Sequence, residues 1–172
     1  LDADALIFVN SIASVSLSDE DWASYCEAHS AIIPKLVVEI TEEEEMNERE
    51  LERKRNVPGS SGVFALDDYG SGYSNGNSLL TIAPKYVKVD IAIIRGIDTD
   101  ADKQQFLMTL IDYAHPRGVQ VLAEGVETLS ELRKVLEMGV DLLQGYCLAR
   151  PAAIPPPLSK EAADIIHRMK RC

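Results

Sequence analysis

Residues 64–77 read FALDDYGSGYSNGN. The apolar run at 63–66 ends in two adjacent acids, Asp67 and Asp68, and a glycine-rich loop follows them. A short apolar run bounded by turn-forming residues is typical of a buried strand. The stretch therefore predicts a strand whose carboxyl end delivers two carboxylates.

The same arrangement recurs along the chain, because short apolar runs alternate with longer helical patterns. The apolar runs predict strands at 6–9, 36–40, 63–66, 86–90, 119–123 and 141–144. The helical patterns predict helices at 19–31, 42–55, 78–82, 101–115, 129–138 and 160–171, with Thr41 and Ser159 as caps. Alternating strands and helices indicate an α/β fold with a parallel sheet. Six strands leave two readings open: an open sheet, or an eight-stranded barrel that lacks its first part.

Composition limits the class of protein. A length of 172 residues favours one domain, and 17 basic against 28 acidic residues give a net charge of −11. This charge argues against binding to DNA or RNA polymers, but it allows a small anionic ligand held through bound metal. Three widely spaced cysteines without a C-x-x-C pair indicate neither a zinc site nor a disulfide framework. We therefore expect a reducing, cytoplasmic setting, and no apolar run reaches membrane-spanning length.

Polar side chains stand at or near the carboxyl end of every predicted strand. They are Asn10, Glu39, Asp67, Asp68, Lys88, Asp90, Glu124, Glu127 and Gln144. Taken singly, an acid beside a glycine is better explained as a turn former or a helix cap than as a site residue. Six strands in succession favour a site instead, because α/β folds bind ligands at this edge of the sheet.

The residue types at these strand ends indicate the chemistry. Amide and carboxylate oxygens suit hard divalent cations such as magnesium or manganese. Carboxylates that converge without a cation would repel one another. Two cations are the usual apparatus for hydrolysing phosphodiesters, and the adjacent Asp67 and Asp68 are suited to serve one each. Lys88 could orient the attacking water, neutralise charge or act as a base.

Six motifs now identify a family. VNS, VEITE, LDDYGSGYS, VKVD, AEGVET and LQGY follow one another from about Leu6 to Pro151, and the series resembles the EAL domain family. That family comprises phosphodiesterases that hydrolyse cyclic di-GMP to linear pGpG. The resemblance implies a (β/α)8 TIM-barrel-like fold with one strand antiparallel to the rest, and two Mg²⁺ or Mn²⁺ ions.

The resemblance also implies metal ligands. It assigns Asn10, Glu39 and Asp67 to one metal and Asp68 to the second. Glu124, in the AEGVE motif, is implied to lie at both metals as a ligand and catalytic residue.

The remaining roles concern water, substrate and a loop. Lys88 is implied to contact the attacking water, and Gln144 to lie near substrate and water. Asp90 and Glu127 fall in the substrate and loop region, where Glu127 is implied to steady the loop after the aspartate pair. The loop itself couples substrate binding, metal binding and dimerisation in the family. Its predicted contacts are Gly70, Ser71, Gly72, Tyr73 and Ser74.

The sequence departs from the family pattern at its start. The Glu-Ala-Leu segment, which supplies a metal ligand and is followed by a substrate-binding arginine, is absent. We therefore expect residues 1–172 to be an EAL domain fragment that lacks the first strand and helix, with weak or no turnover by itself. Self-association into a homodimer and companion sensory or diguanylate cyclase domains in the parent protein are further expectations. Lys85 stands where an aspartate is usual, and we assign it no consequence.

Two alternatives stay open. EAL-like domains also serve as non-catalytic modules that bind cyclic di-GMP or other proteins. An unrelated metal-dependent barrel enzyme, such as an enolase-like one, would also carry acids at its strand ends.

Overall fold

The computed structural model describes residues 5–10, 18–41, 48–56, 62–71 and 77–169. The chain forms two compact units. The first comprises Leu1–Asp67 with Asn75–Lys85, and the second comprises Asp68–Ser74 with Tyr86–Cys172. The boundary falls inside one strand, between the two adjacent aspartates.

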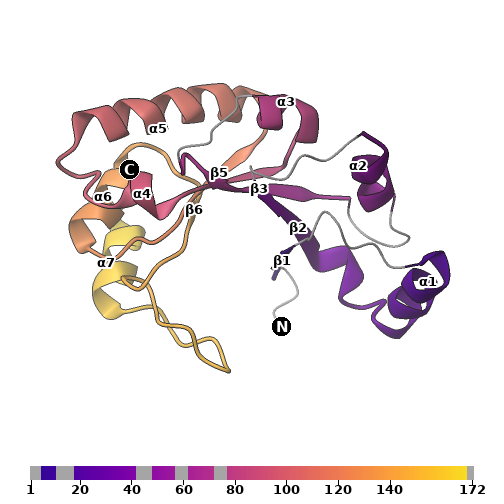
Figure 1. Cartoon of the computed structure of the whole chain (residues 1–172). Helices are drawn as coiled ribbons and strands as arrows, with labels where there is room; N and C mark the ends of the chain where they lie inside the picture. The colour runs from indigo at the N-terminus through magenta and orange to yellow at the C-terminus, as the bar shows by residue number, and fades with distance from the viewer. Residues whose placement is uncertain (1–4, 11–17, 42–47, 57–61, 72–76, 170–172) are drawn as a thin grey trace. The chain divides into compact units, whose positions relative to one another are not determined.

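The first unit is built on parallel strands. Strand β1 (Ile7–Asn10) pairs with β2 (Leu36–Thr41), and β2 pairs with β3 (Phe64–Tyr69), whose last two residues belong to the second unit. Figure 1 shows β1 and β2 side by side. The helices of this unit are α1 (Asp19–Ala28), the 3₁₀ turn η1 (Ile33–Lys35), α2 (Glu48–Arg55) and α3 (Asn77–Ile82).

The second unit repeats the strand–helix alternation. Strand β4 (Tyr86–Val89) pairs in parallel with β5 (Gln120–Ala123), which pairs in parallel with β6 (Leu142–Leu143). Its helices are α4 (Ile91–Ile94), α5 (Ala101–Ala114), α6 (Leu129–Glu137) and α7 (Lys160–Met169), with the 3₁₀ turn η2 (His115–Arg117) after α5. In Figure 1, α5 is the long helix of this unit, and α6 and α7 lie side by side.

Local sequence explains where these helices begin and end. The Asp100 carboxylate accepts hydrogen bonds from the Asp102 and Lys103 N–H groups (3.0 and 3.2 Å) and so caps α5. Gly118, at φ +69°, ends η2 in the left-handed conformation. The Ser159 hydroxyl accepts from the Ala162 N–H (3.3 Å), which confirms Ser159 as the cap of α7.

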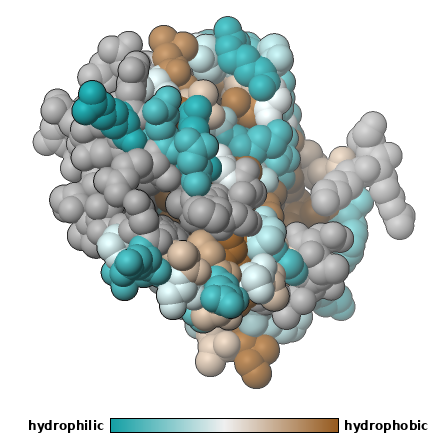
Figure 2. Space-filling view, turned by 90° about the vertical axis from the view of Figure 1, so that its right-hand side faces the viewer, coloured by the Kyte–Doolittle hydropathy of each residue, from teal (hydrophilic) through white to brown (hydrophobic). Residues whose placement is uncertain are grey.

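Hydrophobic burial holds the second unit together. Val87, Val89 and Val121 in the strands have no exposed surface, and neither has Leu107 in α5. Burying a side chain of this size contributes roughly 1.5–3 kcal/mol. On the face shown in Figure 2, hydrophilic side chains are interspersed with isolated hydrophobic ones, as expected for a chain with net charge −11.

The α/β fold and all six strands predicted from the sequence are confirmed. Residues 42–47, predicted as the start of the charged helix, lie outside the described ranges, and Thr41 is the last residue of β2. The four-residue helix α4 was not predicted. In the part of the chain that the structure describes, no helix is long and apolar enough to cross a membrane.

Candidate active site

Strand register aligns three of the predicted ligands in the first unit. Asn10 pairs with Glu39, and Thr41 pairs with Asp67. Because register partners in a parallel sheet point to the same side and side chains alternate along a strand, Asn10, Glu39 and Asp67 face one side of these strands. Glu39 and Asp67 are 7% and 8% exposed, whereas Asn10 is exposed.

Asp68 turns the chain away from the strand. Its φ of +55° lies in the left-handed region, which aspartate tolerates better than most residues. The Ser71 N–H donates to the Asp68 carbonyl (3.2 Å) and closes the turn. Asp68 is exposed where Asp67 is buried, so the adjacent carboxylates occupy different environments.

Gly70 allows this turn to pack inside the second unit. It has φ +98°, and a Cβ atom there would stand 2.8 Å from the Ile93 Cγ1 atom. The neighbouring Tyr69 ring packs against Phe106 of α5, with 6.1 Å between ring centroids. Ser71 is exposed, and the predicted loop contacts Gly72, Tyr73 and Ser74 lie outside the described residues.

Lys88 and Glu124 form an ion pair between neighbouring strands of the second unit. The Lys88 Nζ atom lies 2.9 Å from a Glu124 carboxylate oxygen, with side chains 7% and 16% exposed. Lys88 belongs to β4, and Glu124 directly follows β5 and donates its N–H to the Val89 carbonyl (3.1 Å). A pair this buried is screened far less by water and salt than a surface pair.

A second carboxylate lies beside this pair. Oxygen atoms of Asp68 and Glu124, both in the second unit, lie within 4.8 Å of each other. Two carboxylates at this spacing repel each other unless a cation compensates their charge. Carboxylate oxygens are donors that fit a hard divalent cation.

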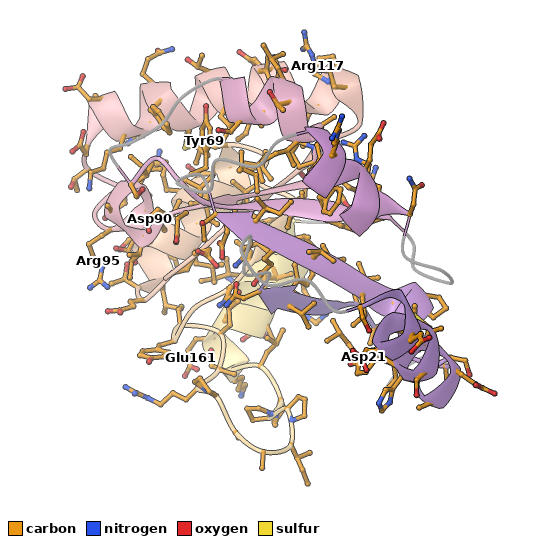
Figure 3. All side chains as sticks on the ribbon, turned by 45° about the vertical axis from the view of Figure 1, so that its right-hand side comes forward. Asp21, Tyr69, Asp90, Arg95, Arg117 and Glu161 are labelled. Atoms are coloured by element: carbon orange, nitrogen blue, oxygen red, sulfur yellow. The ribbon has the colours of Figure 1, made fainter. Side chains whose placement is uncertain are left out.

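Asp90 has a structural partner. Its carboxylate accepts from the Ala92 N–H (2.7 Å) and caps α4, while its own N–H donates to the Tyr69 carbonyl (3.0 Å). Figure 3 shows Asp90 and Arg95 at the two ends of this short helix. The bond to Tyr69 ties the end of β4 to the chain just beyond the aspartate pair.

Glu127 and Gln144 lie at the ends of β5 and β6. The Glu127 carboxylate pairs with Arg95 (2.7 Å). That Glu127 steadies the loop after the aspartate pair stays a prediction. The Gln144 N–H donates to the Ala123 carbonyl (2.9 Å), and its carbonyl accepts from the Val126 N–H (3.0 Å). These bonds hold Gln144 against the loop that joins Glu124 to Glu127.

A pocket of about 530 Å³ opens beside Glu127 and Gln144. Its lining is largely apolar and includes residues of the proline-rich connection at 151–157, before α7, such as Pro151, Pro155 and Pro156. The Arg150 guanidinium lies over the Tyr146 ring, 4.7 Å from its centroid, and both side chains line the pocket. The prediction of site residues from the sequence missed this stacked pair, although Tyr146 directly follows Gln144 and Gly145.

Sequence reasoning also missed Glu131, which is only 2% exposed. Its carboxylate accepts from the Gly96, Glu127 and Thr128 N–H groups at 2.9, 3.0 and 2.9 Å. Burial by itself would raise the pKa of Glu131, but the hydrogen bonds from Gly96, Thr128 and Glu127 outweigh it and lower the pKa. The pattern T-x-x-E at 128–131, a capping box, was the available signal.

Known proteins are similar to this chain in sequence and fold. The EAL domain profile matches residues 2–151. The probable cyclic di-GMP phosphodiesterase PdeG of Escherichia coli K12 is 32% identical over 118 residues, which cover 67% of this chain and 23% of PdeG.

Solved structures of EAL proteins are similar to this chain in fold. A standalone versatile EAL protein of Vibrio cholerae O395, in its c-di-GMP-bound form, is 28% identical with a TM-score of 0.79, and the match covers 95% of this chain and 72% of that one. BlrP1 of Klebsiella pneumoniae, in a manganese and cyclic di-GMP complex, is 26% identical with a TM-score of 0.75, over 87% of this chain and 40% of that one.

Proposed function

The chain belongs to the EAL domain family, and from this premise we propose that the EAL domain of the parent protein hydrolyses cyclic di-GMP to linear pGpG with Mg²⁺ or Mn²⁺, and that residues 1–172 alone do so only weakly. The observation that carries the proposal is the meeting of the Asp68 and Glu124 carboxylates in the second unit, with Lys88 paired to Glu124. The manganese and cyclic di-GMP complex of the related BlrP1 supports both the ligand and the cofactor.

The acidic residues at the strand ends would hold the cations in the proposed reaction. By the family resemblance, Asp67 would hold one cation and Asp68 the other. Asn10 and Glu39 would be further ligands of the first. Divalent cations, when bound, lower the pKa of a coordinated water and neutralise charge on the phosphate oxygens.

Lys88 and Gln144 act on water and substrate. The buried Lys88 ammonium donates a hydrogen bond to the attacking water and balances part of the acidic charge. One water adds across the P–O3′ bond: its oxygen joins phosphorus, the bond to O3′ breaks, and a proton reaches the leaving O3′. The Gln144 amide orients the nucleotide beside this reaction.

The pocket beside Gln144 receives a guanine base in this proposal. Its apolar wall and the stacked Tyr146 and Arg150 side chains suit a flat purine. Stacking of a base on an aromatic side chain contributes about 1–3 kcal/mol. Since about 1.4 kcal/mol corresponds to a tenfold change in affinity, Tyr146→Ala is expected to raise KM for cyclic di-GMP roughly tenfold with little change in kcat.

Product analysis of the purified chain with cyclic di-GMP and Mn²⁺ tests the proposal. We expect pGpG to form only slowly with Mn²⁺ and not at all with a chelator. Asp68→Asn removes a charge but keeps a residue that tolerates the left-handed turn, so it is expected to lower Mn²⁺ affinity at least about tenfold. Asp112→Asn, an exposed carboxylate change on α5, is the matched control and is expected to have no effect.

Calorimetry on the same samples separates binding from turnover. Metal-dependent binding of cyclic di-GMP without pGpG would identify a non-catalytic binding module and overturn the proposed hydrolysis. Absence of both binding and turnover would overturn the proposed ligand as well.

A further inference from the structure

We propose that Glu131 is a positioning residue, because its one buried carboxylate clamps together the two loops that follow β4 and β5. The inference rests on the proposed function, because the two loops lie beyond Lys88, which is on β4, and Glu124, which directly follows β5. Glu131 is the third residue of α6, and Thr128 is its N-cap. In an ordinary capping box the glutamate reaches back only to the N-cap N–H.

Glu131 accepts two further hydrogen bonds that are not required to cap α6. One oxygen of Glu131 accepts from the Gly96 N–H (2.9 Å), which is 35 residues away in the turn after α4. The other oxygen accepts from the Glu127 N–H (3.0 Å) as well as from the Thr128 N–H (2.9 Å). A single side chain therefore connects the segment after Lys88 with the segment after Glu124.

A second link joins the same two loops at the surface. Arg95 and Glu127 pair at 2.7 Å, but their side chains are 50% and 35% exposed. Exposed ion pairs contribute little, because water and salt screen them. The buried carboxylate of Glu131 is the stronger constraint on the spacing of the loops.

The chemistry of the clamp requires an acid at this position. Three N–H donors converge on the two oxygens of Glu131, and a carboxylate is an acceptor at both. A glutamine has the same shape but presents an NH₂ group on one side. Facing either loop, that NH₂ group would oppose an N–H donor and leave it unpaired. Glu131→Gln therefore removes hydrogen bonding to one of the two loops without changing the volume of the side chain.

Amide hydrogen exchange on the full chain tests the clamp without relying on activity. In Glu131→Gln we expect the Gly96 or Glu127 amide to exchange at least about tenfold faster than in wild type. Thr128→Ala is the matched control, because it removes the hydroxyl that accepts from the Glu131 N–H (3.1 Å) but leaves all three bonds to the carboxylate. A stabilising osmolyte keeps both variants folded.

If the Gly96 and Glu127 amides exchange at equal rates in Glu131→Gln and Thr128→Ala, Glu131 does not hold the two loops together and serves only to cap α6. With activity established, Glu131→Gln is expected to lower kcat about tenfold or more while KM changes less than about twofold. Faster exchange with kcat unchanged would overturn the positioning role. If wild type neither binds nor cleaves cyclic di-GMP, the proposed function fails, while the exchange result still decides the clamp.

Discussion

Gly145→Ala is the substitution for which the structure gives the sharpest expectation. Gly145 has φ +156°, a conformation open essentially to glycine alone. A Cβ atom there would collide with the Val126 carbonyl oxygen and nitrogen and stand 2.7 Å from the Val126 carbonyl carbon. These are backbone atoms, so no side chain can swing aside to make room.

The magnitude follows from separate contributions. Backbone strain costs about 1–3 kcal/mol, and forcing an extra carbon into packed backbone costs about 1–3 kcal/mol. Displacing Val126 also weakens its hydrogen bonds to the Gln144 carbonyl and the Cys147 N–H, both 3.0 Å. Each such bond contributes roughly 1 kcal/mol net. We expect Gly145→Ala to lower the free energy of unfolding by about 4 kcal/mol.

Urea denaturation with a matched control measures this. With a slope of about 2 kcal/mol per molar urea, the midpoint should fall by roughly 2 M. Gly118→Ala is the control, since Gly118 also has positive φ (+69°) but nothing lies within 4 Å of the place that its new Cβ atom would take. It should cost only the left-handed strain, about 1–2 kcal/mol. Equal midpoints for the two variants would refute the argument that the collision with Val126 dominates.

Three further predictions concern ionisable side chains. Lys88→Met should lower the free energy of unfolding by about 3–5 kcal/mol, because Glu124 is left without its buried ammonium partner, and thermal unfolding at neutral pH checks this. The lowered pKa of Glu131 means that its contribution to stability is complete above the unfolded pKa of about 4.3 and is lost as pH falls through the folded value. Acid titrations should therefore show a steeper loss of stability in wild type than in Glu131→Gln, and parallel curves would contradict the assignment. Burial, and next the Glu131 charge, raise the pKa of Cys147, so its thiol should react with iodoacetamide at pH 8.5 several-fold more slowly in the native than in the unfolded chain.

The sequence predicted the strands because their apolar runs are short and sharply bounded. It also predicted acids at the ends of the strands, and within the second unit the Asp68 and Glu124 carboxylates lie close together. Helix α4 was missed because Ile91–Ile94 reads as a continuation of an apolar strand. Asp90 illustrates the limit of such reasoning, because a helix cap and a ligand look alike at a strand end.

Glu131 shows a different limit. Its bond to Thr128 was visible as a capping pattern, but the bond to Gly96 joins residues 35 apart and depends on how the loops pack. The same holds for Arg150 over Tyr146, where the i, i+4 spacing occurs outside a helix. Contacts of this kind arise from tertiary structure and have no local pattern.

The proline-rich connection offers a practical opportunity for protein engineering. The Ser159 N–H donates to the Leu148 carbonyl and the Ser159 hydroxyl to the Cys147 carbonyl, both at 2.8 Å, so the connection is fastened at its base before α7 begins. Ile154, at its exposed tip, is 82% exposed and does not line the pocket. Doubling the length of such a loop costs only about 0.6 kcal/mol. A fluorescent reporter attached next to Ile154 would therefore lie near the pocket and leave the hydrogen bonds before α7 in place, which makes the position suitable for detecting a ligand that binds in the pocket.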